Sequence, residues 1–209
     1  MKLLTLASVV LMGLVINNAI RRSNARSKKV MDEFWERERS SYKTPARSVS
    51  DLEYITFPDD LPLNISTDDP QIKEYQETLV NITKNKVLDL SGISNTDIRM
   101  AYGSKNMEEL SRADQRYTTL CRSLNSLSKA YMKTGHSAEA LTLLKFAISC
   151  GSDIKESWML LGQYHMDRDE REEMDKLIEK ASALPENSHT KRDILKELRE
   201  LKGLMEIVS

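Results

Sequence analysis

The C-terminal half of the chain repeats itself at a spacing of 34 residues. Leu124 aligns with Trp158, and Leu127 aligns with Leu161 in the same register. The same spacing pairs small or apolar residues at further positions: Ser128 with Gly162, Leu144 with Ile178, and Ala147 with Ala181. Each unit therefore predicts a helical hairpin. Its first helix carries a bulky anchor, and its small residues lie where two backbones approach closely.

These positions resemble the tetratricopeptide repeat family over residues 121–188. The matching positions are Leu127, Tyr131, Ala140 and Ala147 in the first unit, and Trp158, Leu161, Gly162 and Ala181 in the second. The departures from the family pattern are Leu124 in place of an aromatic residue, Tyr164 one position before the aromatic slot at His165, Met174 in place of a small residue, and Pro185 one residue early. The resemblance implies a solenoid of helical hairpins.

In this family, partners bind the concave face that the first helix of each unit lines. By register, the resemblance places Glu156 and Asp167 on this face, together with eight candidate partner-binding residues: Arg122, Asn125, Lys129, Met132, Lys133, Met159, Gln163 and Met166. The face would be basic at one end and acidic at the other. Methionines beside charges suit a peptide groove. The alternative is that the charged side chains only keep the helix surface solvated.

Two units are fewer than the three or more that such a stack needs, so other helices must complete the core. Asp69 and Pro70 form a helix start, which predicts a helix over 71–84. Asn95 or Thr96 is a candidate cap for a short helix, and a long helical pattern runs from residue 107 until Gly135 stops it. We assign 71–120 to the helical N-terminal part of the domain and 189–209 to a C-terminal capping helix. That helix would pack through Ile194, Leu198, Leu201 and Met205.

The first 20 residues predict a transmembrane anchor. Leu3 to Ile20 is a run of 18 residues without charge, near the lower limit of about 17 for a spanning helix. Five cations follow the run directly: Arg21, Arg22, Arg26, Lys28 and Lys29. By the positive-inside rule, they place the C-terminal domain in the cytoplasm. A cleaved signal peptide is the alternative. The layout resembles that of bacterial single-span membrane proteins with a cytosolic tetratricopeptide-like domain.

Two segments connect the anchor to the domain. Residues 21–42 predict a basic juxtamembrane amphipathic helix, because Val30, Met31, Phe34 and Trp35 share one helical face. Residues 43–70 hold four of the five prolines and predict an extended strap. Apolar side chains recur in the strap at roughly alternate positions, so that one row can press on a neighbouring surface.

The sequence contains no pattern that supports catalysis. His136, His165 and His189 are scattered, Cys121 and Cys150 form no CxxC, and nucleophile, metalloprotease and phosphate-loop motifs are missing. We therefore expect no enzyme activity, metal or cofactor. The net charge of −1 argues against nucleic-acid binding.

Taken together, the patterns predict an all-α protein: an N-terminal membrane-anchor helix, a tetratricopeptide-like solenoid and a capping helix. Its predicted function is that of a non-catalytic, membrane-tethered adaptor that binds a protein or peptide. Two alternatives stay open. One is a structural subunit or assembly factor whose groove is filled by its own strap, and the other is an exported envelope protein with a cleaved signal peptide.

Overall fold

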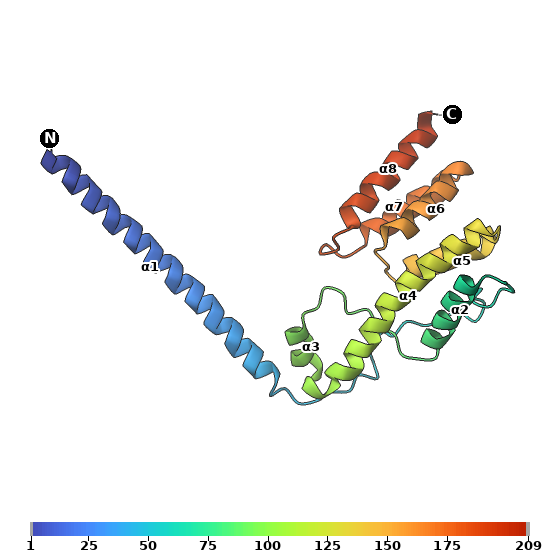
Figure 1. Ribbon diagram of the computed structural model, residues 1–209, viewed down its shortest axis with the longest axis horizontal. Helices are drawn as coiled ribbons and strands as arrows, with labels where there is room; N and C mark the ends of the chain where they lie inside the picture. Colours follow the sequence, from blue (N-terminus) through green and yellow to red (C-terminus); the bar gives the residue numbers. More distant parts are fainter. Residues whose placement is uncertain (1, 208–209) are drawn as a thin grey trace. The chain divides into compact units, whose positions relative to one another are not determined.

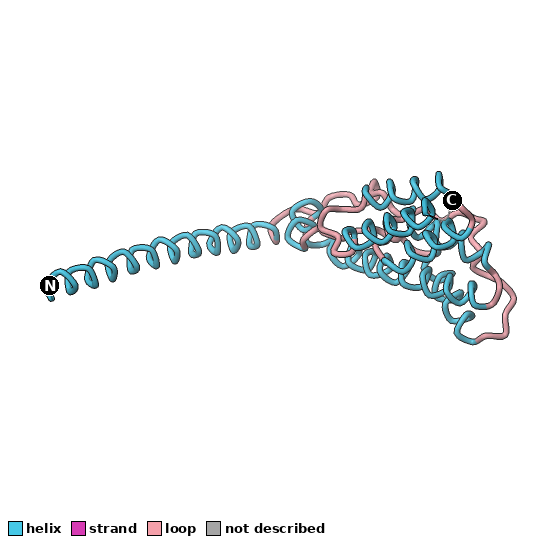
Figure 2. Tube along the Cα trace, turned by 90° about the horizontal axis from the view of Figure 1, so that it is seen from above, coloured by secondary structure: helices cyan, strands magenta, loops and turns pink. Residues whose placement is uncertain are grey.

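The computed structural model describes residues 2–207, although the side chains of residues 2–11, 14, 15 and 207 lie outside the described part. All regular structure within this range is helical, without any strand (Figures 1 and 2), which confirms the all-α prediction. The elements in chain order are α1 (Lys2–Ser41), α2 (Pro70–Thr83), α3 (Asn95–Tyr102), the 3-10 helix η1 (Ser104–Asn106), α4 (Met107–Lys133), α5 (Ser137–Ser149), α6 (Lys155–Asp167), α7 (Arg171–Ser182) and α8 (Lys191–Ile207).

The helices form two compact units. The first contains the chain up to Val49 together with Ser94–Met107, and the second contains Ser50–Ile93 and the chain from Glu108 onward. The sequence predicted one domain in which residues 71–120 formed a single part. The structure instead groups α3 and η1 with α1, through polar contacts that helical periodicity does not reveal.

Helix α1 is continuous from Lys2 to Ser41, so the predicted anchor (1–20), as far as it is described, and the predicted juxtamembrane helix (21–42) up to Ser41 belong to one helix. Its described apolar side chains, from Met12 to Trp35, are exposed. Among the described residues, no helical stretch is both long and apolar enough to cross a membrane. The predicted anchor falls largely on residues whose side chains lie outside the described part.

In the first unit, Arg99 of α3 joins the end of α1. Its guanidinium donates to Glu38 and, at 3.0 Å, to the hydroxyl of Ser41. It also lies over the Tyr42 ring, 4.4 Å from the centroid. The cap of α3 is Ser94, whose hydroxyl accepts from the Asp97 amide at 3.2 Å. The predicted caps, Asn95 and Thr96, lie inside the helix, so the predicted cap position was wrong.

In the second unit, α2 begins as predicted. The Asp69 carboxylate accepts from the amide of Gln71 at 2.8 Å, and Pro70 occupies the first helical position, where its missing N–H is not needed. Helix α4 ends at Lys133, and Gly135 takes a φ of 87° in the turn to α5. Glycine adopts this left-handed conformation without steric cost, which explains why the helical pattern stops there.

The strap packs against the core that α2, α4 and α5 share. Its Leu63 is buried in the same cluster as Leu79, Leu127 and Leu143, and Ile55, Phe57, Leu61 and Ile65 are partly buried against that cluster. The strap lacks helix and strand and is fixed by single hydrogen bonds. One is from the Tyr131 hydroxyl to the Pro62 carbonyl at 3.0 Å, and another is from the Ile55 amide to Val87 at 2.9 Å.

A second cluster lies between α6, α7 and α8, centred on the fully buried Trp158, whose indole donates to the Ser152 carbonyl at 2.8 Å. Gly162 of α6 faces α8 here. A Cβ atom at this position would lie 2.7 Å from Leu198 Cδ2 and 3.1 Å from Leu201 Cδ1. Glycine at position 162, in the second predicted repeat unit, therefore allows α6 to approach α8 closely.

Candidate functional site

The small residues of the repeat are the contact points that bring the helices together. Ser128, Ala140, Ala147 and Ala181 have no exposed surface. The Ser128 hydroxyl donates to the Leu124 carbonyl at 2.7 Å, one turn earlier in the same helix, so its polar group needs no other partner. This packing fixes α4 and α6, which carry the eight candidate partner-binding residues.

The structure divides these eight residues by exposure. Arg122, Lys133 and Gln163 are exposed. Lys129, Met132, Met159 and Met166 are half-buried, and Asn125 is buried. Seven of the eight therefore retain surface that a partner can contact, while Asn125 is buried.

Asn125 connects α4 to α6. Its amide nitrogen donates to Glu156 at 2.8 Å, and its amide oxygen accepts from the Ser157 hydroxyl at 2.9 Å. Lys129 adds an ion pair with Glu156 at 2.6 Å. The hydrogen bonds from Lys129 and then from Asn125 lower the pKa of Glu156 below its usual value. Lys129 of the expected basic end and Glu156 of the expected acidic end thus neutralise each other where α4 and α6 meet.

The methionines are part core and part surface. Met132 packs against both hydrophobic clusters, while Met159 and Met166 pack against the cluster around Trp158. Because unbranched thioether side chains adapt to different neighbours, half-buried methionines in this position supply an apolar surface that can adjust to a ligand.

A hollow of about 230 Å³ lies beside Lys129 and Lys133. Its opposite wall comes from the start of α2, with Asp69, Gln71 and Tyr75. Sequence analysis did not place α2 on this face. The alignment of the two repeat units contained no information on α2, because α2 has no counterpart within them.

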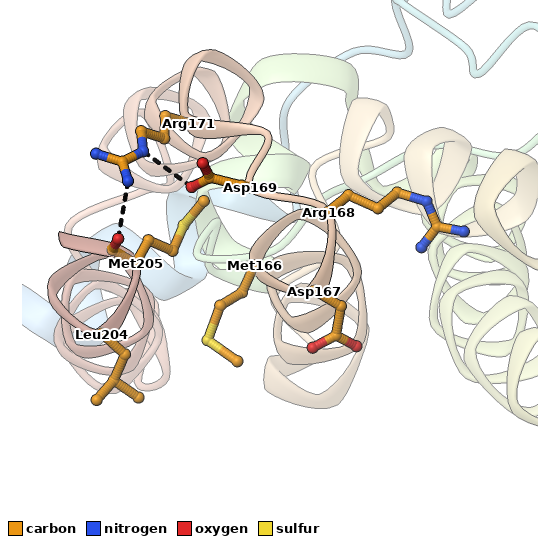
Figure 3. A pocket seen from close by; sticks show the side chains of 7 residues that line it. All are labelled: Met166, Asp167, Arg168, Asp169, Arg171, Leu204 and Met205. Atoms are coloured by element: carbon orange, nitrogen blue, oxygen red, sulfur yellow. Dashed lines mark hydrogen bonds and ion pairs between the residues drawn. The ribbon is translucent and has the colours of Figure 1, made fainter. Parts of the chain in front are cut away.

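A larger hollow of about 790 Å³ lies at the other end of the face, where α6 and α8 end (Figure 3). Met166 is the only candidate residue in its lining. The other lining residues come from the turn after α6 and from α8: Asp167, Arg168, Asp169, Arg171, Leu204 and Met205. Sequence analysis placed Asp167 on the binding face but missed the contribution of α8, which it treated only as a cap.

The histidine and cysteine side chains that could take part in catalysis make contacts within the fold. Buried His165 has its Nδ1 atom 2.6 Å from Glu170, and His136 stacks edge-on against Tyr131. Burial raises the pKa of Cys121 to about 11 and that of Cys150 to about 12, which keeps both thiols protonated at neutral pH. Among the described residues, no three acidic, histidine or cysteine side chains are grouped as metal ligands.

Comparison of the chain with protein-family models, with curated proteins and with solved structures gives no match. The features of this chain that bear on its function lie on the surface of α4, α6 and α8. This surface combines half-buried methionines, exposed polar side chains and two hollows.

Proposed function

We propose that the protein is a non-catalytic adaptor, tethered to a membrane, that binds a protein or peptide through the face of α4 and α6 in a tetratricopeptide-like domain. The observation that carries this proposal is the partial exposure of Met132, Met159 and Met166 beside charged and polar side chains on two packed helices. Half-buried methionines next to charges suit recognition of a peptide by an adaptable surface.

Two features support the proposed membrane tether: the uncharged run that ends at Ile20, and the five exposed cations between Arg21 and Lys29. Cations on this flank favour a cytoplasmic location for the following domain. A tether concentrates the domain and a membrane-associated partner in a thin layer, so that a partner with weak intrinsic affinity still binds.

A second candidate is a structural subunit or assembly factor, and the strap supports it. Leu63 is buried in the cluster of α2, α4 and α5, and the strap backbone accepts hydrogen bonds from Tyr131 and Gln76. The strap thus covers hydrophobic surface of its own domain. These contacts involve α2 and the hairpin of α4 and α5, whereas Met159, Gln163 and Met166 lie on α6.

Photo-crosslinking in cells tests the adaptor. The photoreactive residue p-benzoylphenylalanine replaces exposed Gln163 on α6 and, as a matched control, exposed Thr142 on α5. We expect a discrete protein adduct at position 163 and none at position 142. Equal adducts at both positions, or none at either, would contradict a binding face on α6.

Charge reversal then separates the two candidates. Lys129→Glu places a second carboxylate beside Glu156 and is expected to remove the adduct and to weaken the α4–α6 contact. The double variant Lys129→Glu/Glu156→Lys restores the ion pair. If the protein is an adaptor that recognises Lys129, the double variant should regain stability but still show no adduct. If it is a structural subunit, only stability should change: it should fall in Lys129→Glu and return in the double variant.

A further inference from the structure

The hollow at the ends of α6 and α8 has the size of a ligand pocket. Its volume of about 790 Å³ lies within the range of roughly 300–1,000 Å³ that is typical of such pockets. Figure 3 shows Met166 of α6 and Leu204 of α8 pointing toward the same side of the two helices. The two side chains are therefore available to one ligand.

Two hydrogen bonds of Arg171 connect the two sides of the pocket. Arg171 donates from Nε to Asp169 at 2.9 Å and from its terminal nitrogen to the carbonyl of Met205 at 2.9 Å, so that it links the turn after α6 to α8. Asp169 has a φ of 55° and is the only described residue other than glycine with a positive φ. Aspartate tolerates this conformation better than most residues. The contacts of Arg171 connect the two sides of the pocket before a ligand binds, and preorganisation of this kind favours affinity.

The floor of the pocket is apolar and open to solvent. Leu204 is 50% exposed, and Ile93 is the only other large hydrophobic side chain described in the second unit that is exposed. Met166 is half-buried, and Met205, which also lines the pocket, is buried. Leu204 and Met166 form an apolar part of the hollow that suits an apolar side chain, and the volume of about 790 Å³ leaves room for neighbouring residues of the same ligand.

The charges around the pocket favour a cation beside that side chain. Asp169 is paired with Arg171. Arg168 also lines the pocket, but its guanidinium lies over the Tyr164 ring, 3.8 Å from the centroid, and extends away from Leu204 and Met205 (Figure 3). Asp167 has no ion pair among the described residues and accepts a neutral hydrogen bond from Gln163 at 2.7 Å. Helices α6 and α8 also both end here, and helix C-termini attract positive charge.

We propose that this pocket binds an apolar side chain of the partner peptide, with a lysine or arginine next to it in the peptide paired with Asp167. The inference rests on the proposed function, because Met166 belongs both to the pocket and to the binding face of α6. It adds the chemistry of the partner: a basic peptide with an apolar anchor.

Selection from a phage-displayed library of random dodecapeptides tests the inference. The target is the full chain in lipid nanodiscs, with empty nanodiscs for counter-selection. We expect enriched peptides to carry an apolar residue beside lysine or arginine. Leu204→Glu should weaken them by at least about tenfold, the lower end of the effect expected for the loss of one apolar contact. Arg199→Glu, an exposed position of α8 outside the pocket lining, is the matched control and should leave their affinity unchanged.

Asp167→Lys provides a second test that does not depend on the apolar floor. Lysine is favoured at a helix C-terminus, so this variant should fold, and selection on it should favour peptides with acidic rather than basic residues beside the anchor. Peptides that bind Leu204→Glu and Asp167→Lys undiminished but lose affinity for Lys129→Glu would overturn the pocket and leave the proposed function intact. Failure to enrich any peptide on the natural chain would overturn both.

Discussion

Gly162→Ala tests the contact between α6 and α8, on which the C-terminal part of the second unit depends. The added Cβ would lie 2.7 Å from Leu198 Cδ2, and Leu198 has no exposed surface into which it can retreat. Overpacking of this kind costs about 1–3 kcal/mol, whereas replacing glycine by alanine within a helix returns about 1 kcal/mol through helix propensity. The net expectation is a loss of about 1 kcal/mol in the free energy of unfolding.

Gly203→Ala, on α8, is the control, because a Cβ at this position would meet no atom within 4 Å. It should gain up to about 1 kcal/mol from the same change in propensity, so the two variants should differ by about 2 kcal/mol, the cost of crowding alone.

Urea unfolding of the full chain, in the background Trp35→Phe, measures this difference. Trp158, fully buried in the affected cluster, is then the sole tryptophan. If Gly162→Ala were as stable as Gly203→Ala, α8 would not pack against α6 as described, and the reasoning would be refuted.

Three further outcomes follow from the contacts and from the proposed topology. Tyr131→Phe removes the hydroxyl that donates to the Pro62 carbonyl and should lower the free energy of unfolding by about 1–2 kcal/mol, as measured by urea unfolding; an unchanged midpoint would mean that the strap is not fixed there. The pKa of Glu156 is lowered in the folded state by Lys129, so its contribution to stability is present above its unfolded pKa, near 4.5, and is lost as the pH falls through the lower folded value. Glu156→Gln should therefore flatten the loss of thermal stability below pH 4.5, and an identical profile would exclude this role. For a cytoplasmic domain, Ser50→Cys in an otherwise cysteine-free chain should react with an impermeant maleimide only after cell lysis, whereas labelling of intact cells would indicate an exported protein.

Local sequence signals predicted the features that depend on neighbouring residues. The start of α2 followed from Asp69 and Pro70, and the end of α4 followed from Gly135, because capping and left-handed turns involve only a few adjacent residues. The close approach at Gly162 followed from the repeat register. The helix on the other side of this contact, α8 (Lys191–Ile207), lies within the segment 189–209 that was predicted to be helical.

Features that depend on contacts between distant residues could not be predicted in this way. Arg99 joins Glu38 across 61 positions of the chain, and no periodic pattern marks that pair. The repeat register places Asn125 on the concave binding face, yet it is buried, and Glu156 and Ser157 of α6 satisfy its amide. The pocket lining was missed for the same reason, since Leu204 meets Met166 only when α8 lies beside α6.

The strap has a consequence for synthesis on the ribosome. The Pro62 carbonyl accepts its hydrogen bond from a tyrosine that lies 69 residues later in the chain. At a translation rate of about 5–20 residues per second, Tyr131 is made on the order of 3–14 s after Pro62. During that interval, the apolar row from Ile55 to Ile65 has no helical surface of α4 and α5 to cover it. The nascent chain therefore presents a short extended hydrophobic segment, of the kind that chaperones bind, until the first hairpin is complete.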